Sequence, residues 1–317
     1  MRKRGVFVFC ITIVFLLIGF SSAGLIDWFG KITGKATQQN TNVTIAVTGT
    51  ASVTIEMFNE TLTGTTVDPI SDSTKQINVT VRVTDTDGFS DINTTSVTMN
   101  FSRTGETTRI NNTCSDLSQN TVNAKNFTCT IYMWYYDDSG TWTINAAAKD
   151  LGNGTLIVNS TMVFIYGSLK NIEMHPTQIT FPSSAQAAVN VTANTPTFVN
   201  NTGNYNFTGI NVTALNLYGE TVTTVMINIA NITIGNNTGL NSCDVSSNMG
   251  ANATVLTNGT TTNVKHSILT RGNHSINNNQ TGQEQIFYCF RTIPTGIQSQ
   301  TYSSAYTGGQ WIITAQQ

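Results

Sequence analysis

The sequence predicts an all-β protein: two immunoglobulin-like β-sandwiches that follow a signal peptide and a short amphipathic arm. Segments in which polar and apolar residues alternate at period two recur from Thr41 to the carboxyl end. Clusters rich in Gly, Asp and Asn separate these segments, as expected for turns. Hydrophobic residues make up 39% of the 317 residues, enough to bury a core beneath a polar surface.

The amino-terminal segment has the features of a signal peptide. Residues 2–4 are basic, Gly5 to Phe20 form an uncharged and mostly apolar run, and residues 21–23 supply the small side chains of a cleavage site. We therefore expect residues 1–23 to be removed, so that the mature chain begins at Gly24. Two alternatives stay open: a prepilin-like signal that is cut after Gly5, and an uncleaved anchor.

Residues 24–40 form the predicted arm and linker. Residues 24–35 place apolar side chains at helical spacing opposite charged ones. This pattern is typical of contact with a membrane surface, the cell envelope or a neighbouring subunit. Packing on the first domain is an equally good interpretation, and we expect residues 36–40 to be a flexible joint.

The first predicted sandwich spans residues 41–167. About seven strands is the number found in an immunoglobulin-like sandwich, although the antibody hallmark of two distant cysteines flanking a Trp is absent. Three turn clusters, at residues 85–88, 137–140 and 151–154, predict hairpins. The predicted strands are Thr41–Gly49, Ser52–Phe58, Gln76–Thr84, Thr95–Ser102, Phe127–Tyr136, Thr141–Lys149 and Thr155–Tyr166.

The second predicted sandwich spans residues 168–317. A polar stretch between Leu240 and Gln283 is interpreted as long loops. The predicted strands are Asn171–Phe181, Ala187–Asn194, Phe207–Gly219, Thr221–Gly235, His266–Thr270, Glu284–Ile293 and Gln310–Ala315.

The cysteine count predicts two disulfides. Cleavage of the signal removes Cys10 and leaves four cysteines, an even number in an exported chain, which allow three connectivities. We favour Cys114 with Cys129 and Cys243 with Cys289, because each pair then lies within one predicted domain. Loops of these lengths give roughly 3 to 4 kcal/mol each in the chain-entropy model.

The chain is rich in Asn-x-Ser/Thr sequons, the acceptors of N-glycosylation in secreted proteins. It holds about nineteen, whereas composition alone predicts roughly nine. Polar outer faces of strands also generate sequons, because residues i and i+2 share a face. Glycan acceptors are the favoured interpretation, and both interpretations place these side chains in water. The sequon residues are Asn42, Asn59, Asn78, Asn93, Asn100, Asn111, Asn126, Asn153, Asn159, Asn190, Asn200, Asn206, Asn211, Asn231, Asn236, Asn252, Asn258, Asn273 and Asn279.

The charge pattern limits the partners of the chain. Charged residues make up 10% of the sequence and the formal net charge is −2, so we expect no nucleic-acid partner. Between residues 176 and 264 only Glu220 and Asp244 are charged. Such a surface suits a domain that is glycosylated or packed against copies of itself.

Catalytic motifs are not found in the sequence. Its three histidines do not have metal-ligand spacing, and no nucleophile, phosphate-loop or dinucleotide motif is present. We therefore expect neither an enzyme nor a cofactor. Asp85, Asp87 and Asp91 surround Gly88 and offer hard oxygen ligands that suit calcium. The favoured interpretation of this segment is a solvated Asp-Gly hairpin.

Six segments of the sequence are distinctive: Gly30–Ala36, Asp85–Ile92, Cys129–Tyr136, Gly140–Ile144, Asn201–Asn204 and Gln285–Cys289. Together they resemble secreted, immunoglobulin-like surface proteins of small-genome (DPANN-type) archaea. The resemblance covers most of the mature chain; it implies an archaeal cell surface and β-sandwich modules, and it carries no catalytic residues. Archaeal S-layer proteins often end in a membrane-spanning segment, and the lack of one here puts a simple S-layer anchor in doubt, whereas surface threads and pili offer another arrangement.

These observations predict an extracellular, glycosylated structural subunit that assembles with copies of itself into a lattice or filament. Strand donation by Thr41–Thr48 to a neighbour is one mode of assembly, although we favour this segment as the first strand of its own domain. The first alternative is an adhesin that contacts host cells or glycans through Trp134, Tyr135, Tyr136 and Tyr218. The second alternative is a prepilin-like pilus subunit.

Overall fold

The computed structural model describes residues 54–57, 64–152, 154, 156–236, 243, 253–276, 280–306 and 309–317. The chain divides into two compact units, Met1–Thr48 and Gly49–Gln317, and every described residue belongs to the second. The predicted signal peptide, the arm and the predicted strand at residues 41–49 therefore lie outside the described residues.

The described part of the chain is all-β, which confirms the predicted fold class. Its only helical elements are short 3-10 turns, and no helix among the described residues is long and apolar enough to cross a membrane. The turns are η1 (Phe89–Asp91), η2 (Ile229–Asn231) and η5 (His274–Ile276).

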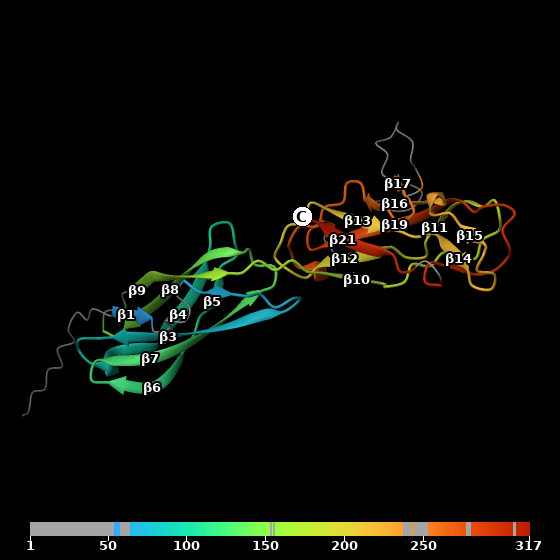
Figure 1. Ribbon diagram of the computed structural model, residues 1–317. Helices are drawn as coiled ribbons and strands as arrows, with labels where there is room; N and C mark the ends of the chain where they lie inside the picture. Colours follow the sequence, from blue (N-terminus) through green and yellow to red (C-terminus); the bar gives the residue numbers. More distant parts are fainter. Residues whose placement is uncertain are drawn as a thin grey trace, which may run out of the picture. The chain divides into compact units, whose positions relative to one another are not determined.

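Two sheets form the first sandwich (Figure 1). In both sheets neighbouring strands run antiparallel, except for the short parallel pair of β2 and β9. The four-stranded sheet has the order β1 (Thr54–Met57), β3 (Thr74–Thr84), β7 (Ala124–Trp134), β6 (Ser115–Thr121). The five-stranded sheet has the order β2 (Thr66–Val67), β9 (Leu156–Tyr166), β8 (Gly140–Asp150), β4 (Ile92–Ser102), β5 (Arg109–Asn111).

Alternation along the long strands builds the core of this sandwich. Successive side chains of a strand point to opposite faces, so the apolar residues of each strand gather on one side. The two sheets bury these faces against each other, while Asn, Thr and Gln occupy much of the outer faces. The buried set includes Ile77, Val79, Val81, Val83, Phe127, Ile131, Met133, Trp142, Ile144, Ala146 and Phe164.

The second sandwich has a separate hydrophobic core, and all pairs of its named strands are antiparallel. Its six-stranded sheet comprises β10 (Ile172–His175), β12 (Thr197–Asn201), β19 (Gln283–Thr292), β16 (Ile232–Gly235), β17 (Ala253–Val255) and β11 (Val189–Thr192). The remaining strands form two small sheets: β18 (Thr261–Asn263), β13 (Gly209–Thr213) and β21 (Ile312–Gln316); and β15 (Met226–Ile227), β14 (Leu217–Gly219) and β20 (Tyr302–Ser303).

Two of the three turns that were expected to close hairpins do not. The segment at residues 85–91 leads from β3 in one sheet to β4 in the other, and residues 135–139 lead from β7 to β8 in the same way. Of the three predicted turns, only the one at residues 151–154 lies between two strands that pair with each other, β8 and β9. Crossovers of this kind place their polar residues at the two ends of the sandwich.

Some strands differ from the predicted ones. The strands β2, β5, β6, β12 and β20 were not predicted, and β17 and β18 lie within the stretch expected to be loops. The expected strand at His266–Thr270 is wrong; only isolated bridges form there, between Leu269 and Phe207 and between Thr270 and Thr281.

Both favoured disulfides are confirmed. Cys114 lies in the loop before β6 and bonds to Cys129 of β7, across a sequence separation of 15 residues. Cys243 bonds to Cys289 of β19, across 46 residues. Both cysteines of the first bond are buried in the core of their sandwich.

Removing either disulfide should destabilise the protein by widening the unfolded ensemble. The chain-entropy model gives losses of about 3 kcal/mol for Cys114→Ala/Cys129→Ala and about 4 kcal/mol for Cys243→Ala/Cys289→Ala. Urea denaturation of the two double variants beside the wild type measures both values. If either double variant is as stable as the wild type, its disulfide does not reduce the conformational entropy of the unfolded chain.

Candidate functional site

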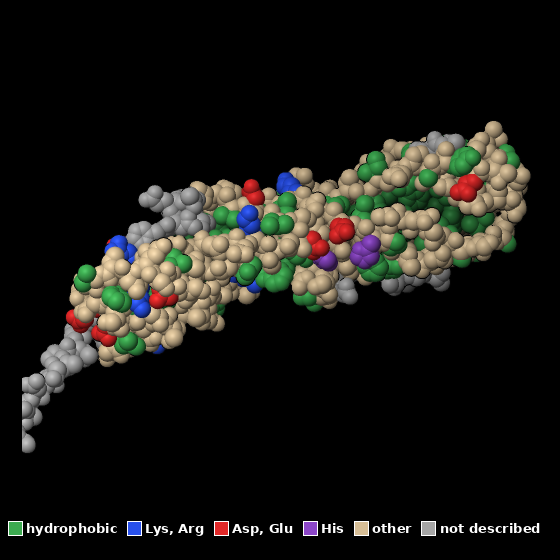
Figure 2. Space-filling view, turned by 90° about the horizontal axis from the view of Figure 1, so that it is seen from below, with side chains coloured by type: hydrophobic (Ala, Val, Ile, Leu, Met, Phe, Trp, Pro, Cys, Tyr) green, Lys and Arg blue, Asp and Glu red, His purple; other side chains and the backbone are tan. Residues whose placement is uncertain are grey.

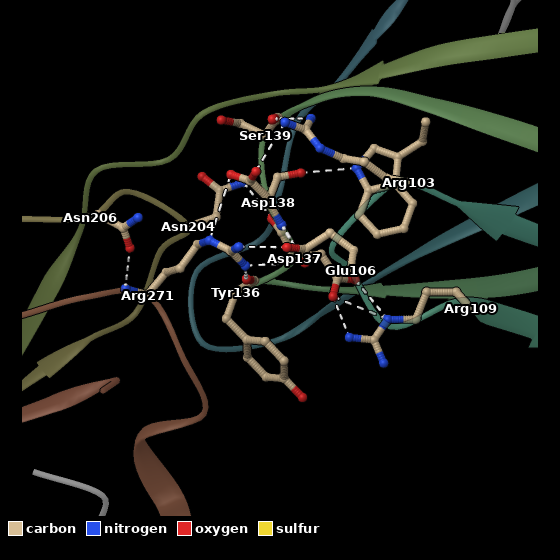
Figure 3. Close-up of polar contacts among 11 residues, drawn as sticks. Arg103, Glu106, Arg109, Tyr136, Asp137, Asp138, Ser139, Asn204, Asn206 and Arg271 are labelled. Carbon is tan, nitrogen blue, oxygen red and sulfur yellow. Dashed lines mark hydrogen bonds and ion pairs between the residues drawn. The ribbon is translucent and has the colours of Figure 1, made fainter. Parts of the chain in front are cut away.

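Charged side chains gather where the end of the first sandwich contacts the second, and we call this set of contacts the junction (Figure 3). Asp137, in the crossover from β7 to β8, is buried. The Nε of Arg109 donates to both of its carboxylate oxygens, at 3.1 and 3.0 Å, and the backbone N–H of Trp134 donates to Oδ2 at 2.7 Å. Burial raises the pKa of Asp137, and the bonds from Arg109 oppose this shift.

Arg271 of the second sandwich reaches three groups of the first. Its Nη1 and Nη2 donate to the two carboxylate oxygens of Glu106, at 3.2 and 2.5 Å, and Nη1 also donates to the carbonyl of Tyr136 at 3.0 Å. Its Nε lies 3.6 Å from Asp138, which is also paired with Arg103 at 3.0 Å. The fork of the guanidinium therefore meets a carboxylate in a bidentate arrangement, the strongest kind of side-chain pair.

Asn204 completes the junction from the second sandwich. Its Nδ2 donates to the carbonyls of Asp137, at 3.0 Å, and Gly167, at 2.8 Å, while its Oδ1 accepts from the N–H of Leu169 at 2.7 Å. The neighbouring Gly203 allows this close approach, because a Cβ there would lie 2.1 Å from the carbonyl oxygen of Leu169. A side chain at this position would force the segments apart.

The aromatic residues beside the crossover pack within the junction. The ring of Trp134 stacks on Tyr136 at 5.6 Å, and Tyr135 meets Tyr136 edge-on at 5.0 Å. Tyr135 is 4% exposed, and its hydroxyl accepts from the N–H of His274 at 3.3 Å. The Nε2 of His274 lies 2.6 Å from Asp72 of the first sandwich.

The junction links the two sandwiches through paired groups. Its ionised groups meet partners of opposite charge, and its hydroxyl and amide groups are engaged in bonds that cross from one sandwich to the other. Such an arrangement resists displacement of the two sandwiches. Sequence reasoning missed Arg271, Glu106 and Asn204, because no local sequence pattern marks these residues and their partners come from distant segments of the chain.

The three aspartates that the sequence singled out do not stay together. Asp85 and Asp91 lie near Asp150, at the end of β8, and oxygen atoms of these three carboxyl groups lie within 4.8 Å of one another. Asp87 is exposed and outside this group, although its N–H donates to Asp85 at 2.9 Å. The expectation of a solvated hairpin is wrong for Asp85, which is fully buried.

Most of the described sequon residues reach solvent, as expected. Asn78, Asn190, Asn206 and Asn258 are exposed. Partly exposed are Asn93, Asn100, Asn111, Asn126, Asn159, Asn211, Asn231 and Asn273. Outside the described residues lie Asn42, Asn59, Asn153, Asn252 and Asn279.

Two sequons contradict the expectation that all of them lie in water. Asn200 is 4% exposed, and its Oδ1 accepts from Gln283 at 2.8 Å. Asn236 is 7% exposed, and its Nδ2 donates to the carbonyl of His266 at 3.0 Å. Both side chains make hydrogen bonds inside the second sandwich, so neither is an accessible glycan acceptor in the folded protein.

A hollow in the second sandwich lies beside β11 and β19. It offers hydroxyl, amide and apolar groups, and the hydroxyl of Tyr288 lies 3.0 Å from that of Thr197 within the core. The lining residues are Thr192, Ala193, Asn194, Thr195, Pro196, Phe287 and Tyr288.

Comparison with protein-family models finds no match to the chain, and comparison with curated protein sequences finds none either.

Breaking the bidentate pair of the junction should destabilise the protein. The side chains of Arg271 and Glu106 are 25% and 11% exposed, between a surface pair and a fully buried one, so Arg271→Met should cost about 1–3 kcal/mol. A double-mutant cycle with Glu106→Gln, followed by urea denaturation, should give a coupling energy of at least about 1 kcal/mol.

The matched control is Arg291→Met, which removes an exposed arginine of β19 and should change stability by less than about 0.5 kcal/mol. A coupling energy near zero between Arg271 and Glu106 would contradict a stabilising junction.

The junction should also respond to alkaline pH through Tyr135. Burial raises its pKa from 10.0 to about 12. The neutral phenol is favoured in the folded state, so its contribution to stability is complete below about pH 10 and is lost as the pH rises to about 12. Subtracting the tyrosinate absorbance titration of Tyr135→Phe from that of the wild type should leave one step near pH 12, and a step near pH 10 would refute this assignment.

Proposed function

We propose that the protein is a structural subunit of an extracellular cell surface, which assembles with copies of itself and acts mechanically. The observation that carries this proposal is the junction, in which Arg271, Glu106, Asp137 and Asn204 tie two sandwiches together through paired and largely buried groups. A subunit that transmits force along its length needs such a joint. A linker between two domains that do not contact each other would extend before the domains themselves give way.

The two disulfides support an extracellular site of action. Disulfides persist in oxidising compartments and are uncommon in the cytosol. Each bond lies within one sandwich, so each holds its own sandwich closed if the chain is pulled. Both bonds therefore support a load-bearing role.

The surface supports packing against copies of the same chain and attachment of sugars. On the face shown in Figure 2 few side chains are charged, and most of the surface is made of other side chains and backbone, with some hydrophobic side chains between them. Charge repulsion between copies is therefore weak. Twelve described sequon residues are exposed or partly exposed, and glycans on them would supply the solubility that charge does not.

Sheet edges offer sites for strand addition. β6 and β10 each have one named strand neighbour in their sheets. The side chains of β6 are exposed along its whole length, and its register with β7 shifts between Asp116 and Asn120, a feature that protects an edge. The edge at β10 has regular pairing with β12, so we propose it as the acceptor of a donated strand.

An adhesin is the second candidate function. Tyr132 and Trp134 are 51% and 39% exposed, and both project from the outer face of β7. Two neighbouring aromatic rings on one face suit contact with the apolar face of a sugar. Of the four aromatic residues expected to bind, Tyr135 is buried and Tyr136 stacks on Trp134 in the junction, so Trp134 is available only through its exposed part; Tyr132 was not among the four.

Electron microscopy of the native cell envelope, with intact-mass analysis of the extracted protein, tests the proposal. We expect a regular array or fibre containing a chain that begins at Gly24 and exceeds its sequence mass by several kilodaltons. A dispersed, unmodified monomer would overturn the structural role and leave the adhesin. Binding of cells or glycans that is lost in Tyr132→Ala/Trp134→Ala would then be the expected result.

A further inference from the structure

The acidic triad, which we define as Asp85, Asp91 and Asp150, lies at the end of the first sandwich away from the junction. Asp85 follows β3, Asp91 ends η1 before β4, and Asp150 ends β8 (Figure 1). The pairing of β3 with β7 shows which end this is. Thr84, next to Asp85, pairs with Ala124 at one end of the two strands, whereas the junction lies beyond Trp134, which pairs with Thr74 at the other end. The triad therefore joins one strand of the four-stranded sheet to two strands of the five-stranded sheet.

Backbone contacts hold these carboxyl groups close together. Ile92 is the register partner of Asp150, and the N–H of Leu151 donates to the carbonyl of Asp91 at 2.8 Å. Gly88 has a φ of 117°, which favours glycine, and its N–H donates to the carbonyl of Asp85 at 3.3 Å. Main-chain contacts thus bring the three residues close together.

Asp85 provides an observation that does not depend on the clustering of acids. Its side chain is fully buried, and its Oδ2 has no hydrogen-bond partner among the described residues, while Oδ1 accepts from the N–H of Asp87. A buried carboxylate oxygen without a donor is unfavourable, and such groups are usually paired or coordinate a metal. Oxygen atoms of Asp91 and Asp150 lie within 4.8 Å of a carboxylate oxygen of Asp85.

The electrostatics of the triad also favour a bound cation. Burial raises the pKa of Asp85, and the carboxylate of Asp150 raises it further. The pKa of Asp91 is raised by desolvation and by the carboxylates of Asp150 and Asp85. Like charges at this distance repel one another, and a bound cation removes the repulsion.

We propose that Asp85, Asp91 and Asp150 bind one calcium ion, which ties the two sheets of the first sandwich together. Three carboxylates with no Cys or His among them are hard oxygen ligands. Oxygen atoms within 4.8 Å of one another fit around one ion that binds each at 2.3–2.6 Å. Calcium accepts irregular, partly dry sites, whereas magnesium keeps several waters and a strict octahedron.

The experiment is calorimetric titration of the full chain, stripped with a chelator, with CaCl2 and in parallel with MgCl2. We expect one Ca²⁺ per chain with a Kd of about 0.1–1 mM, as in extracellular modules, and weaker binding of Mg²⁺. At 10 mM CaCl2 the unfolding temperature should rise by about 3–10 °C. The measurement uses monomeric protein in solution, so its outcome does not depend on the proposed assembly.

Five charge-neutralising variants separate binding from structure. Asp85→Asn and Asp150→Asn should abolish the calcium response, and without calcium they should be as stable as the wild type or more so, because repulsion is relieved. Asp91→Asn, at a half-buried position, serves the same purpose if Asp85→Asn fails to fold. Asp87→Asn, outside the triad, should keep the response, as should Glu173→Gln on the second sandwich.

Two results would overturn the proposal. One is the absence of any heat of binding or thermal shift up to 10 mM CaCl2. The other is a calcium response with the wrong residue dependence. Such a response survives Asp85→Asn and Asp150→Asn, or it is lost in Asp87→Asn but kept in Asp150→Asn.

Discussion

The fold of the first sandwich depends on burial of alternate side chains between two sheets. The apolar faces of β3, β7 and β8 have no other way to leave water, and their packing fixes the register of every neighbouring strand. Register in turn decides which residues stand at the ends of the sandwich. The acidic triad and Asp137 of the junction are both consequences of this core, because they lie at or beside the ends of its long strands.

Charged groups of the first sandwich gather at these two ends, where they have different partners. At the junction, Asp137 and Glu106 meet arginines, so their negative charge is neutralised within the chain. At the opposite end, Asp85 lies with other carboxyl groups. Because the β3–β4 connection and the β7–β8 connection both cross between sheets, polar groups at either end act on both layers at once. A charged contact there stabilises the sandwich as a unit and not one strand alone.

The sequence predicted the fold class, the long strands and the disulfide pairing, because each depends on local pattern or on a simple count. Strands β3, β7, β8 and β9 alternate over eleven residues each and could not be missed. Strand β6 was missed because all its side chains are exposed, and β12 because its buried Asn200 and Asn201 have the composition of a loop. Asp150 and Arg271 could not be assigned, since their partners are brought near by register and by packing of distant segments.

The two buried sequons place a constraint on the order of events in biosynthesis. Asn200 lies in β12 opposite Gln283 of β19, and Asn236 directly follows β16, another neighbour of β19. A sugar on either side chain has no room once these strands pair. If the chain meets its glycosyltransferase before it folds, modification at Asn200 or Asn236 diverts it from the native state; if it folds first, these sites are hidden. Early pairing of β12 and β16 with β19 would therefore keep Asn200 and Asn236 from being modified.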